Sequence, residues 1–257
     1  MKSPILIIGL GELGSVFARG FLRLGYPVQA LSRQDALDSV AQHLPAPEAV
    51  LIAVGEADLH PVLTKLPAVW KDRVILLQNE LLPRDWLAHH LSNPTVISVW
   101  FEKKKGMDSK VVVPSPIFGP HAKLLFNALA QLDLPSFIVD KDTELLFELV
   151  RKNLYILTTN IAGLEVGGTV AQLSSQHGSQ MRAVFADVLE IQSYLSGQTQ
   201  ASEPLLQAML EAFAGDPNHQ CMGRSAPARL ARALQFADLA NLEVPTLRAI
   251  AAKHLHA

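Results

Sequence analysis

The first half of the chain contains a series of short apolar runs that are typical of buried strands. Ile5 to Ile8 form a continuous apolar run that stops at a glycine, which is typical of a strand covered on both faces of a parallel sheet. The following residues have helical spacing as far as Leu24, and a second strand is predicted at Val28 to Leu31. Further strands are predicted at residues 49–54, 74–77, 96–99, 110–113 and 137–139, with a helix at residues 58–66. Pro-rich turns between the last strands predict an antiparallel extension of the sheet.

The pattern changes to long helical periodicity near residue 140. A helix that begins near Thr143 is apolar almost all round, as a helix buried within its domain is. Few strand signals follow it. We therefore predict two domains, with a boundary near residue 140: an α/β domain over residues 1–140 and an all-helical domain over residues 141–257.

A glycine motif joins the first strand to the first helix. Gly9, Leu10, Gly11, Glu12, Leu13 and Gly14 fit the pattern G-x-G-x-x-G in the required order of strand, turn and helix. Gly9 permits the tight turn, Gly11 lets a pyrophosphate approach the backbone, and Gly14 allows close packing of helix on strand. The helix N-terminus offers free N–H groups to phosphates. The motif predicts a Rossmann-type, doubly wound sheet that binds a dinucleotide; the alternative is a glycine-rich turn in another α/β fold.

The residues after the second strand indicate which dinucleotide is bound. An acidic residue there would bind the ribose 2′-hydroxyl of NAD, but this chain has Ser32 and Arg33. A hydroxyl and a guanidinium can hold a 2′-phosphate, whereas a carboxylate would repel it. Asp35 could be the acidic residue, although it falls beyond the strand in a polar turn. We predict NADP as the cofactor.

Composition narrows the range of functions. The 257 residues are 49% hydrophobic, enough to bury one large core or two modest ones, and 22 Lys and Arg against 24 Asp and Glu provide no field that attracts nucleic acid. Cys221 is the only cysteine, which excludes a disulfide within the chain and favours a cytoplasmic location. No apolar stretch approaches the ~20 residues that span a bilayer. The pair His254 and His256 has unsuitable spacing for a metal site on a helix, and we expect no metal.

Two polar residues interrupt the long apolar helix. Lys152 and Asn160 lie eight positions apart, which places them about 80° apart around the helix, with Thr159 about 20° from Lys152. The three residues therefore share one side. Lys152 could extend its ammonium to the surface, and Asn160 could be a capping or packing residue near Gly163. A role at a site is the other possibility.

At this point the sequence resembles the ketopantoate reductase family across nearly its whole length. The matching residues are the glycine motif, Arg33, the run Leu77-Gln78-Asn79, Arg151-Lys152 with Asn160, and Val244-Pro245-Thr246. The resemblance implies an NADP-binding Rossmann domain, a helical substrate domain, and an active site in the cleft between them. It assigns Lys152 as the general acid toward a keto oxygen while NADPH delivers hydride to the carbon. Asn160 matches an active-site asparagine, and Asn79 one near the junction of cofactor and substrate; Val54 is expected among the cofactor-binding residues.

The chain also departs from the family at the substrate site. The family's lysine after the third strand would fall near Val54-Gly55-Glu56, where no basic residue stands, and Ile156 occupies the place of a second asparagine. The Asn-Gly turn is here Asn79-Glu80. The family's substrate-binding glutamate would fall near Ser225 and its serine near Phe213.

These observations predict an NADPH-dependent oxidoreductase that reduces a small keto acid similar to ketopantoate, with a small molecule as its substrate and the ability to form a homodimer. Arg224 or Arg229 is a candidate for binding a carboxylate, the alternative being a solvated charge on a helix. The missing family residues motivate a second hypothesis, a catalytically silent NADP-binding sensor or regulatory protein. An imine-type dehydrogenase that shares only the Rossmann half is a third.

Overall fold

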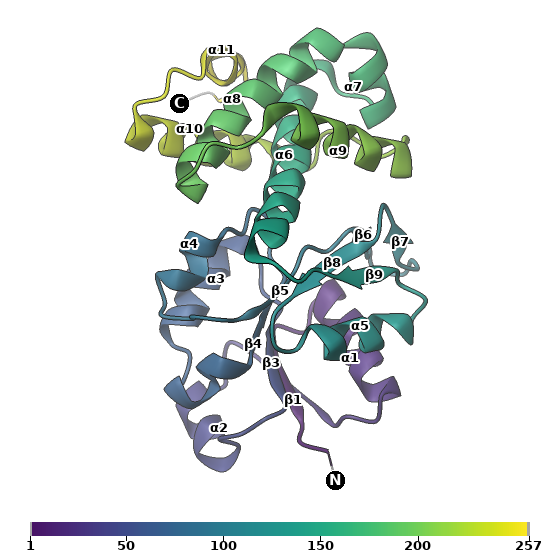
Figure 1. Cartoon of the computed structure of the whole chain (residues 1–257), viewed down its shortest axis with the longest axis vertical. Coiled ribbons are helices and arrows are strands. Elements are labelled where there is room, and N and C mark those ends of the chain that lie inside the picture. Colours follow the sequence, from purple (N-terminus) through teal and green to yellow (C-terminus); the bar gives the residue numbers. More distant parts are fainter. Residues whose placement is uncertain (1, 256–257) are drawn as a thin grey trace. The chain divides into compact units, whose positions relative to one another are not determined.

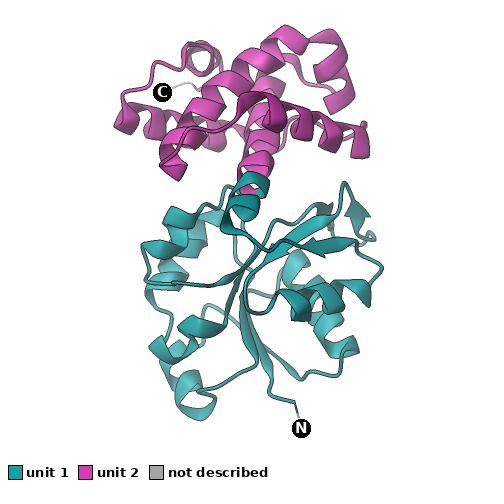
Figure 2. Ribbon diagram, in the orientation of Figure 1, with its two compact units in different colours: residues 1–148 teal, residues 149–257 magenta. Residues whose placement is uncertain are grey.

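The computed structural model describes residues 2–255, so His256 of the terminal histidine pair lies outside the described residues. The chain forms two compact units, residues 1–148 and 149–257 (Figure 2). The helix α6 (Asp142–Val166) crosses the division between them. The boundary predicted near residue 140 falls just before this helix begins.

A seven-stranded sheet forms the centre of the first unit, with the strand order β2-β1-β3-β4-β5-β8-β9. The strands β1 to β5 run parallel. Their bounds are β1 Ile5–Ile8, β2 Val28–Leu31, β3 Ala49–Ile52, β4 Val74–Leu76, β5 Thr95–Ile97, β8 Ser115–Phe118 and β9 Ser136–Ile138. The predicted α/β class, with an all-helical region after it, is confirmed.

Strand β1 lies between β2 and β3, so the chain changes direction across the sheet at this strand. Ile5 aligns with Val28 on one side and with Ala49 on the other. In an open parallel sheet, the crevice beyond the carboxyl ends of the strands at such a switch point is where ligands bind. The glycine motif begins at this end of β1.

Helices cover both faces of the sheet (Figure 1). Helices α1 (Glu12–Arg23) and α5 (Ala122–Ala130) lie on one face, and α2 (Leu37–His43), α3 (Glu56–Thr64), the 3-10 helix η1 (Ala68–Arg73) and α4 (Pro83–Leu87) on the other. Phe17 and Phe21 of α1 are fully buried against Ile5 and Ile7. A Cβ on Gly20 would lie 2.6 Å from the Ala128 oxygen, so this glycine allows α1 and α5 to pack closely.

The antiparallel extension forms, and the strands predicted at residues 96–99 and 137–139 correspond to β5 and β9, but β8 between them was not predicted. Strand β8 pairs antiparallel with β5 and parallel with β9. Strand β8 contains Pro116, and the prolines in this segment indicated a turn when only the sequence was considered. Proline has no N–H donor but keeps its carbonyl, and the Pro116 carbonyl accepts a hydrogen bond from the Ser98 N–H. The predicted strand at residues 110–113 lies outside the sheet. There β7 (Lys110–Val111) pairs with β6 (Phe101–Glu102) in a separate two-stranded ribbon.

The second unit is helical. After α6 come α7 (Val170–Gln176), α8 (Gly178–Ser196), α9 (Ser202–Gly215), α10 (Ala226–Ala240) and α11 (Pro245–His254). Side chains of α6 bond to α8, α9 and α10: Asn153 to Gln192, Arg151 to the Ala208 carbonyl, and Asn160 to Arg229. Within residues 2–255, no helix is both long enough and apolar enough to cross a membrane.

Candidate functional site

The glycine motif forms a tight turn in which two glycines are required by space. Gly9 has a φ of +94°, and a Cβ there would lie 2.8 Å from the Ala53 oxygen. A Cβ on Gly14 would lie 2.3 Å from the Gly9 oxygen. Both distances are shorter than real Cβ atoms show to backbone atoms. A side chain at either position would therefore displace the turn from the start of α1 or from the residue after β3.

Gly11 differs from its two neighbours in the motif. Its φ is −80°, and a Cβ there would meet no heavy atom of the described residues within 4 Å. It is the N-cap of α1, and no described side chain caps the first N–H groups of that helix. Open space in front of free N–H donors and the positive end of a helix is a good environment for a phosphate.

The three remaining residues of the motif differ in their exposure. Leu10 is 54% exposed. Glu12 stands exposed in the first turn of α1, where its negative charge stabilises the helix N-terminus. Leu13 is partly buried and packs against the core beneath α1.

The turn after β2 holds one cation and one carboxylate. Arg33 is highly exposed and forms an ion pair with Asp58 of α3, with 2.8 Å between its Nη2 and the Oδ2. The backbone N–H and the hydroxyl of Ser32 both donate to Asp35. These two bonds, first that of the hydroxyl, hold the pKa of Asp35 below its usual range. Asp35 therefore lies closer to the predicted phosphate-binding residues than its place in the sequence indicated.

A buried glutamine, to which the sequence assigned no function, fixes the loop after β3. The Gln78 Nε2 donates to the carbonyl oxygens of Ile52 and Val54 at 2.7 and 3.3 Å, and its Oε1 accepts from the Leu77 N–H. These bonds hold Val54, which is half-buried beside Gly9, at the end of β3. The signal available in the sequence was a polar residue directly after a fully buried strand.

Asn79 lies near the same edge of the sheet. Its Nδ2 donates to the Glu56 Oε1 at 3.1 Å, and Glu56 begins α3. The Glu56 carboxylate thus contacts the amide of Asn79, in the region where the family resemblance would place a lysine. The next residue, Glu80, has a φ of +59°, so the Asn79-Glu80 turn adopts a conformation that favours glycine, although the glycine of the family is missing.

In the second unit, α6 carries the predicted catalytic residues. Lys152 is partly exposed, with its Nζ 6.0 Å from the centroid of the Tyr155 ring. Thr159 is buried and its hydroxyl donates to the Tyr155 carbonyl within the helix. Asn160 is 8% exposed. Its Nδ2 donates to the Cys221 carbonyl at 3.3 Å, and its Oδ1 accepts from the Arg229 Nη1 at 2.9 Å.

The two candidate arginines differ in their surroundings. Arg229 of α10 is partly buried against Asn160, whereas Arg224, which precedes α10, is exposed. Ser225, near the place of the family glutamate, is the exposed N-cap of α10. Phe213, near the place of the family serine, packs edge-on against the Tyr155 ring with 5.5 Å between centroids. Of the two candidate arginines, Arg229 is therefore the one that contacts Asn160.

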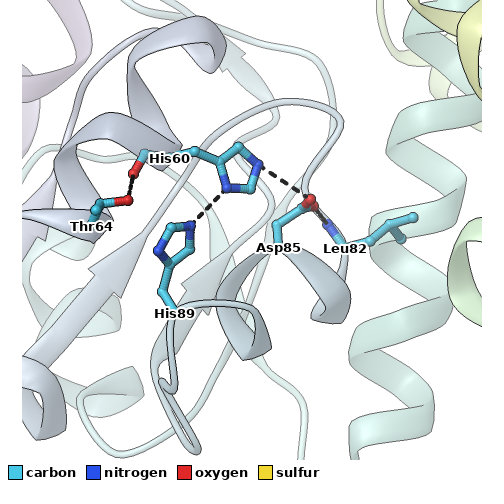
Figure 3. Close-up of polar contacts among 5 residues, drawn as sticks. All are labelled: His60, Thr64, Leu82, Asp85 and His89. Carbon is cyan, nitrogen blue, oxygen red and sulfur yellow. Dashed lines mark hydrogen bonds and ion pairs between the residues drawn. The ribbon is translucent and has the colours of Figure 1, made fainter.

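A separate polar cluster lies on α3, α4 and the residues after α4 (Figure 3). The His60 Nδ1 and the His89 Nε2 are 2.9 Å apart, and the His60 Nε2 lies 3.7 Å from the Asp85 carboxylate. Burial, followed by the charge of His60, lowers the pKa of His89, while burial raises the pKa of Asp85. Among residues 2–255, no group of three or more His, Cys, Asp or Glu side chains is placed to hold a metal ion.

No protein-family model and no curated protein sequence matches the chain. Many solved structures do. A 2-dehydropantoate 2-reductase from Methylococcus capsulatus is 14% identical with a TM-score of 0.69, over 97% of this chain and 94% of that one. A dimeric ketopantoate reductase from Staphylococcus aureus is 20% identical with a TM-score of 0.65, over 97% and 96%. D-mandelate dehydrogenase in complex with NADH is 12% identical with a TM-score of 0.66, over 99% and 97%.

These likenesses extend over both units of the chain. At identities of 20% or less they establish the fold, which is that of ketopantoate reductases, and the resemblance noted in the sequence is confirmed at this level. The fold also occurs in a dehydrogenase with bound NADH. Substrate and chemistry have to be argued from the residues of this chain.

Proposed function

We propose that this protein is an NADPH-dependent reductase of a small keto acid, in which Lys152 is the general acid. The observation that carries the proposal is the open glycine turn at the switch point of the sheet, because Gly11 leaves room for a phosphate while Gly9 and Gly14 are packed against backbone. The shared fold with ketopantoate reductases supports it.

The residues present fit a dinucleotide. The pyrophosphate would bind at Gly9, Leu10, Gly11, Glu12, Leu13 and Gly14, where the first N–H groups of α1 point out of the helix. Ser32 and Arg33 would hold the 2′-phosphate, and Val54 and Asn79 would contact the half of the cofactor that carries the nicotinamide. Bound NADPH supplies the hydride that the carbonyl carbon receives.

The chain supplies the proton and the orientation of the substrate. As the carbonyl carbon gains hydride, its oxygen becomes an alkoxide, and the Lys152 ammonium donates a proton to it. The amide of Asn160 is held by Cys221 and Arg229 and would hydrogen-bond the substrate on the same side of α6. The product is a 2-hydroxy acid. Asn160 and Lys152 are the two residues of α6 to which we assign the reaction.

One observation favours the catalytically silent sensor as a second candidate. Glu56 bonds to Asn79, so a carboxylate lies where the family has a lysine, and a negative charge there would oppose the binding of an acidic substrate. An imine-type dehydrogenase that shares only the Rossmann half has less support, because the likeness to ketopantoate reductases includes the helical unit. We also propose a homodimer, since the Staphylococcus aureus ketopantoate reductase of the same fold is dimeric; the cytoplasmic location stays a prediction.

The test is the oxidation of NADPH, followed by its absorbance, with a panel of 2-keto acids and cyclic imines. Turnover of at least one keto acid supports the reductase. Tight NADPH binding with no turnover of any compound contradicts it in favour of the sensor, and turnover of imines alone favours the third candidate.

A further inference from the structure

Strand β9 is one end of the sheet in the first unit, and no strand of the described residues pairs with its outer side (Figure 1). The other end of the sheet is β2, where the exposed residues are Gln29 and Ala30. Strand β9 instead exposes two large apolar side chains, since Phe137 is 38% and Ile138 41% exposed. Apolar side chains beside backbone that no strand covers are the combination to which a further strand binds.

The outward backbone groups of β9 follow from its bonds to β8. Two of these bonds run from the Ser115 N–H to the Pro135 carbonyl and from the Val139 N–H to the Ile117 carbonyl. The N–H and carbonyl groups of successive residues point alternately to the two sides of a strand, so those of Ser136 and Ile138 point away from β8. These two residues therefore present two donors and two acceptors on the outer side.

The residues on either side of β9 already use their N–H groups. The Leu134 N–H donates to the Leu129 carbonyl, and the Asp140 N–H donates to the Glu144 carboxylate at 3.1 Å. Neither N–H is available to a new strand in this fold. A strand that pairs with the outer side must therefore match the donors and acceptors of residues 136 and 138 alone.

We infer that β9 pairs antiparallel with β9 of a second copy of this chain, about a two-fold axis at Phe137. The inference rests on the homodimer proposed above and adds the surface through which it forms. Ser136 then lies opposite Ile138 of the second copy, and the two such pairs each exchange two N–H···O bonds. A shift of the register by two residues in either direction would place Leu134 or Asp140 in the ladder, where the N–H is already bonded.

Charges at the ends of the pairing are complementary in the same register. Asp133 lies opposite Lys141 of the second copy, and both side chains are exposed, so each end brings a carboxylate to an ammonium. Asp140 falls opposite Leu134. Within residues 133–141, no charged side chain therefore lies directly opposite a side chain of like charge.

The apolar side chains also match their own copies. Phe137 lies opposite Phe137 as a non-hydrogen-bonded pair, with about 4.5 Å between the Cα atoms, where aromatic side chains contact across strands. Ile138 aligns with Ile117 of β8, which belongs to the core beneath α1 and α5. On that face it meets Ser136 of the second copy, whose small side chain leaves room for it. A second copy of the chain thus satisfies the backbone, the charges and the exposed apolar side chains together.

The first measurement traps the dimer at its two-fold axis in the whole chain. Phe137→Cys is oxidised with glutathione disulfide, and the covalent dimer is measured by nonreducing electrophoresis. A Cα separation of about 4.5 Å suits a disulfide, whereas the two copies of residue 138 are about 8 Å apart, beyond its reach. Phe137→Cys should therefore cross-link about tenfold or more faster than the matched control Ile138→Cys. Cys221, the native cysteine, is fully buried, so wild type should not cross-link.

The second measurement is the dissociation constant of the dimer by sedimentation. Ile138→Pro removes an outward N–H and leaves the bonds between β9 and β8 in place, so it should weaken the dimer by about tenfold or more. Phe137→Asp, which places two carboxylates opposite each other, should weaken it as well and replaces Ile138→Pro if circular dichroism shows that variant unfolded. Leu239→Asp alters an exposed leucine of α10 in the second unit and should match wild type.

The outcomes separate the surface from the dimer and from the reaction. Wild-type dissociation constants in the folded β9 variants, dissociation by Leu239→Asp alone, or equal cross-linking of Phe137→Cys and Ile138→Cys would overturn the inference and keep the homodimer. A wild type that stays monomeric would contradict both. No residue of this edge is assigned to the reaction, so the absence of turnover would contradict the reductase and leave the inference standing.

Discussion

The glycine turn of the first unit and the Asn160–Arg229 pair of the second unit are built in opposite ways. The turn uses backbone: Gly9 and Gly14 are required by contacts within the β1–α1–β3 region, and Gly11 leaves space. The pair uses side chains from α6 and α10 that are 69 residues apart. A site made of backbone tolerates change in its exposed side chains, such as Leu10, while a site made of side chains changes with each substitution. This difference predicts that the glycine turn tolerates substitutions around it better than the Asn160–Arg229 pair does.

The largest effect is expected at Lys152, in the second unit. Lys152→Ala should lower kcat by about 10²–10⁴-fold, the range for removal of a general acid, with NADPH affinity nearly unchanged. Steady-state kinetics and a cofactor titration measure the two quantities. Lys141→Ala, which removes an exposed lysine just before α6, is the matched control. Activity in Lys152→Ala within a few-fold of wild type would mean that the lysine only extends to the surface.

The pH profile sharpens the same assignment. Because the reaction needs the protonated ammonium, wild-type reduction should fall at alkaline pH. A rate that stays constant to about pH 12, well above the ordinary lysine pKa of about 10.4, would require another proton donor.

The next effect separates the two kinds of glycine within the turn. Gly11→Val should fold and lose NADPH binding, since its side chain would enter the space that the pyrophosphate needs. Gly14→Ala should instead unfold more readily, by about 1–3 kcal/mol, because its Cβ would lie 2.3 Å from the Gly9 oxygen. Thermal unfolding and fluorescence titration of both variants test this. Unchanged NADPH affinity in a folded Gly11→Val protein would show that the turn has only a structural role.

A smaller effect is expected at the turn after β2. NADPH should bind several-fold more tightly than NADH, and Arg33→Ala should remove the difference, because the guanidinium would exchange Asp58 for the 2′-phosphate. Asp35→Asn keeps an acceptor for Ser32 and removes a negative charge, so it should increase the preference for NADPH. Fluorescence titration with both cofactors provides the ratio. Equal affinities in wild type, or a preference for NADH that persists in Arg33→Ala, would contradict the choice of NADP.

The smallest effect concerns pH and the first unit's histidine pair. Burial, followed by the charge of His60, lowers the pKa of His89 in the folded state below its ordinary value of 6.5, which the unfolded chain retains. The unfolded state therefore binds more protons as pH falls below 6.5, and stability falls with it. The positive charges of Lys71 and His90 also lower the pKa of His89, whereas the negative charge of Asp85 raises it. The unfolding temperature should fall by about 1 °C more between pH 7 and 6 in wild type than in His89→Gln. An identical change in both proteins would refute this contribution.

The sequence predicted the parts of the molecule whose causes are local. The glycine motif, the first five strands of the sheet and the long apolar α6 each follow from residues adjacent in the chain. Strand β8 was missed because Pro114 and Pro116 indicate turns, and only the neighbouring β5 and β9 show that this backbone can still pair.

Contacts of the candidate site that join distant parts of the chain could not be predicted from the sequence, because they depend on tertiary packing. Gln78 fixes the loop after β3 through bonds to carbonyl groups 24 and 26 residues away, and no local pattern contains that information. The contact of Arg229 with Asn160 likewise depends on how α10 packs. The sequence could name both arginines as candidates, and the packing distinguishes Arg229 from Arg224.

The most direct test of the proposed reaction is a crystal structure with NADPH and a nonreducible analogue of a keto acid bound. We predict the pyrophosphate on the N–H groups that follow Gly11, and the Lys152 Nζ within hydrogen-bonding reach, about 2.6–3.2 Å, of the oxygen that receives the proton. A cofactor bound elsewhere, or a Lys152 side chain directed into solvent while both ligands are in place, would contradict it.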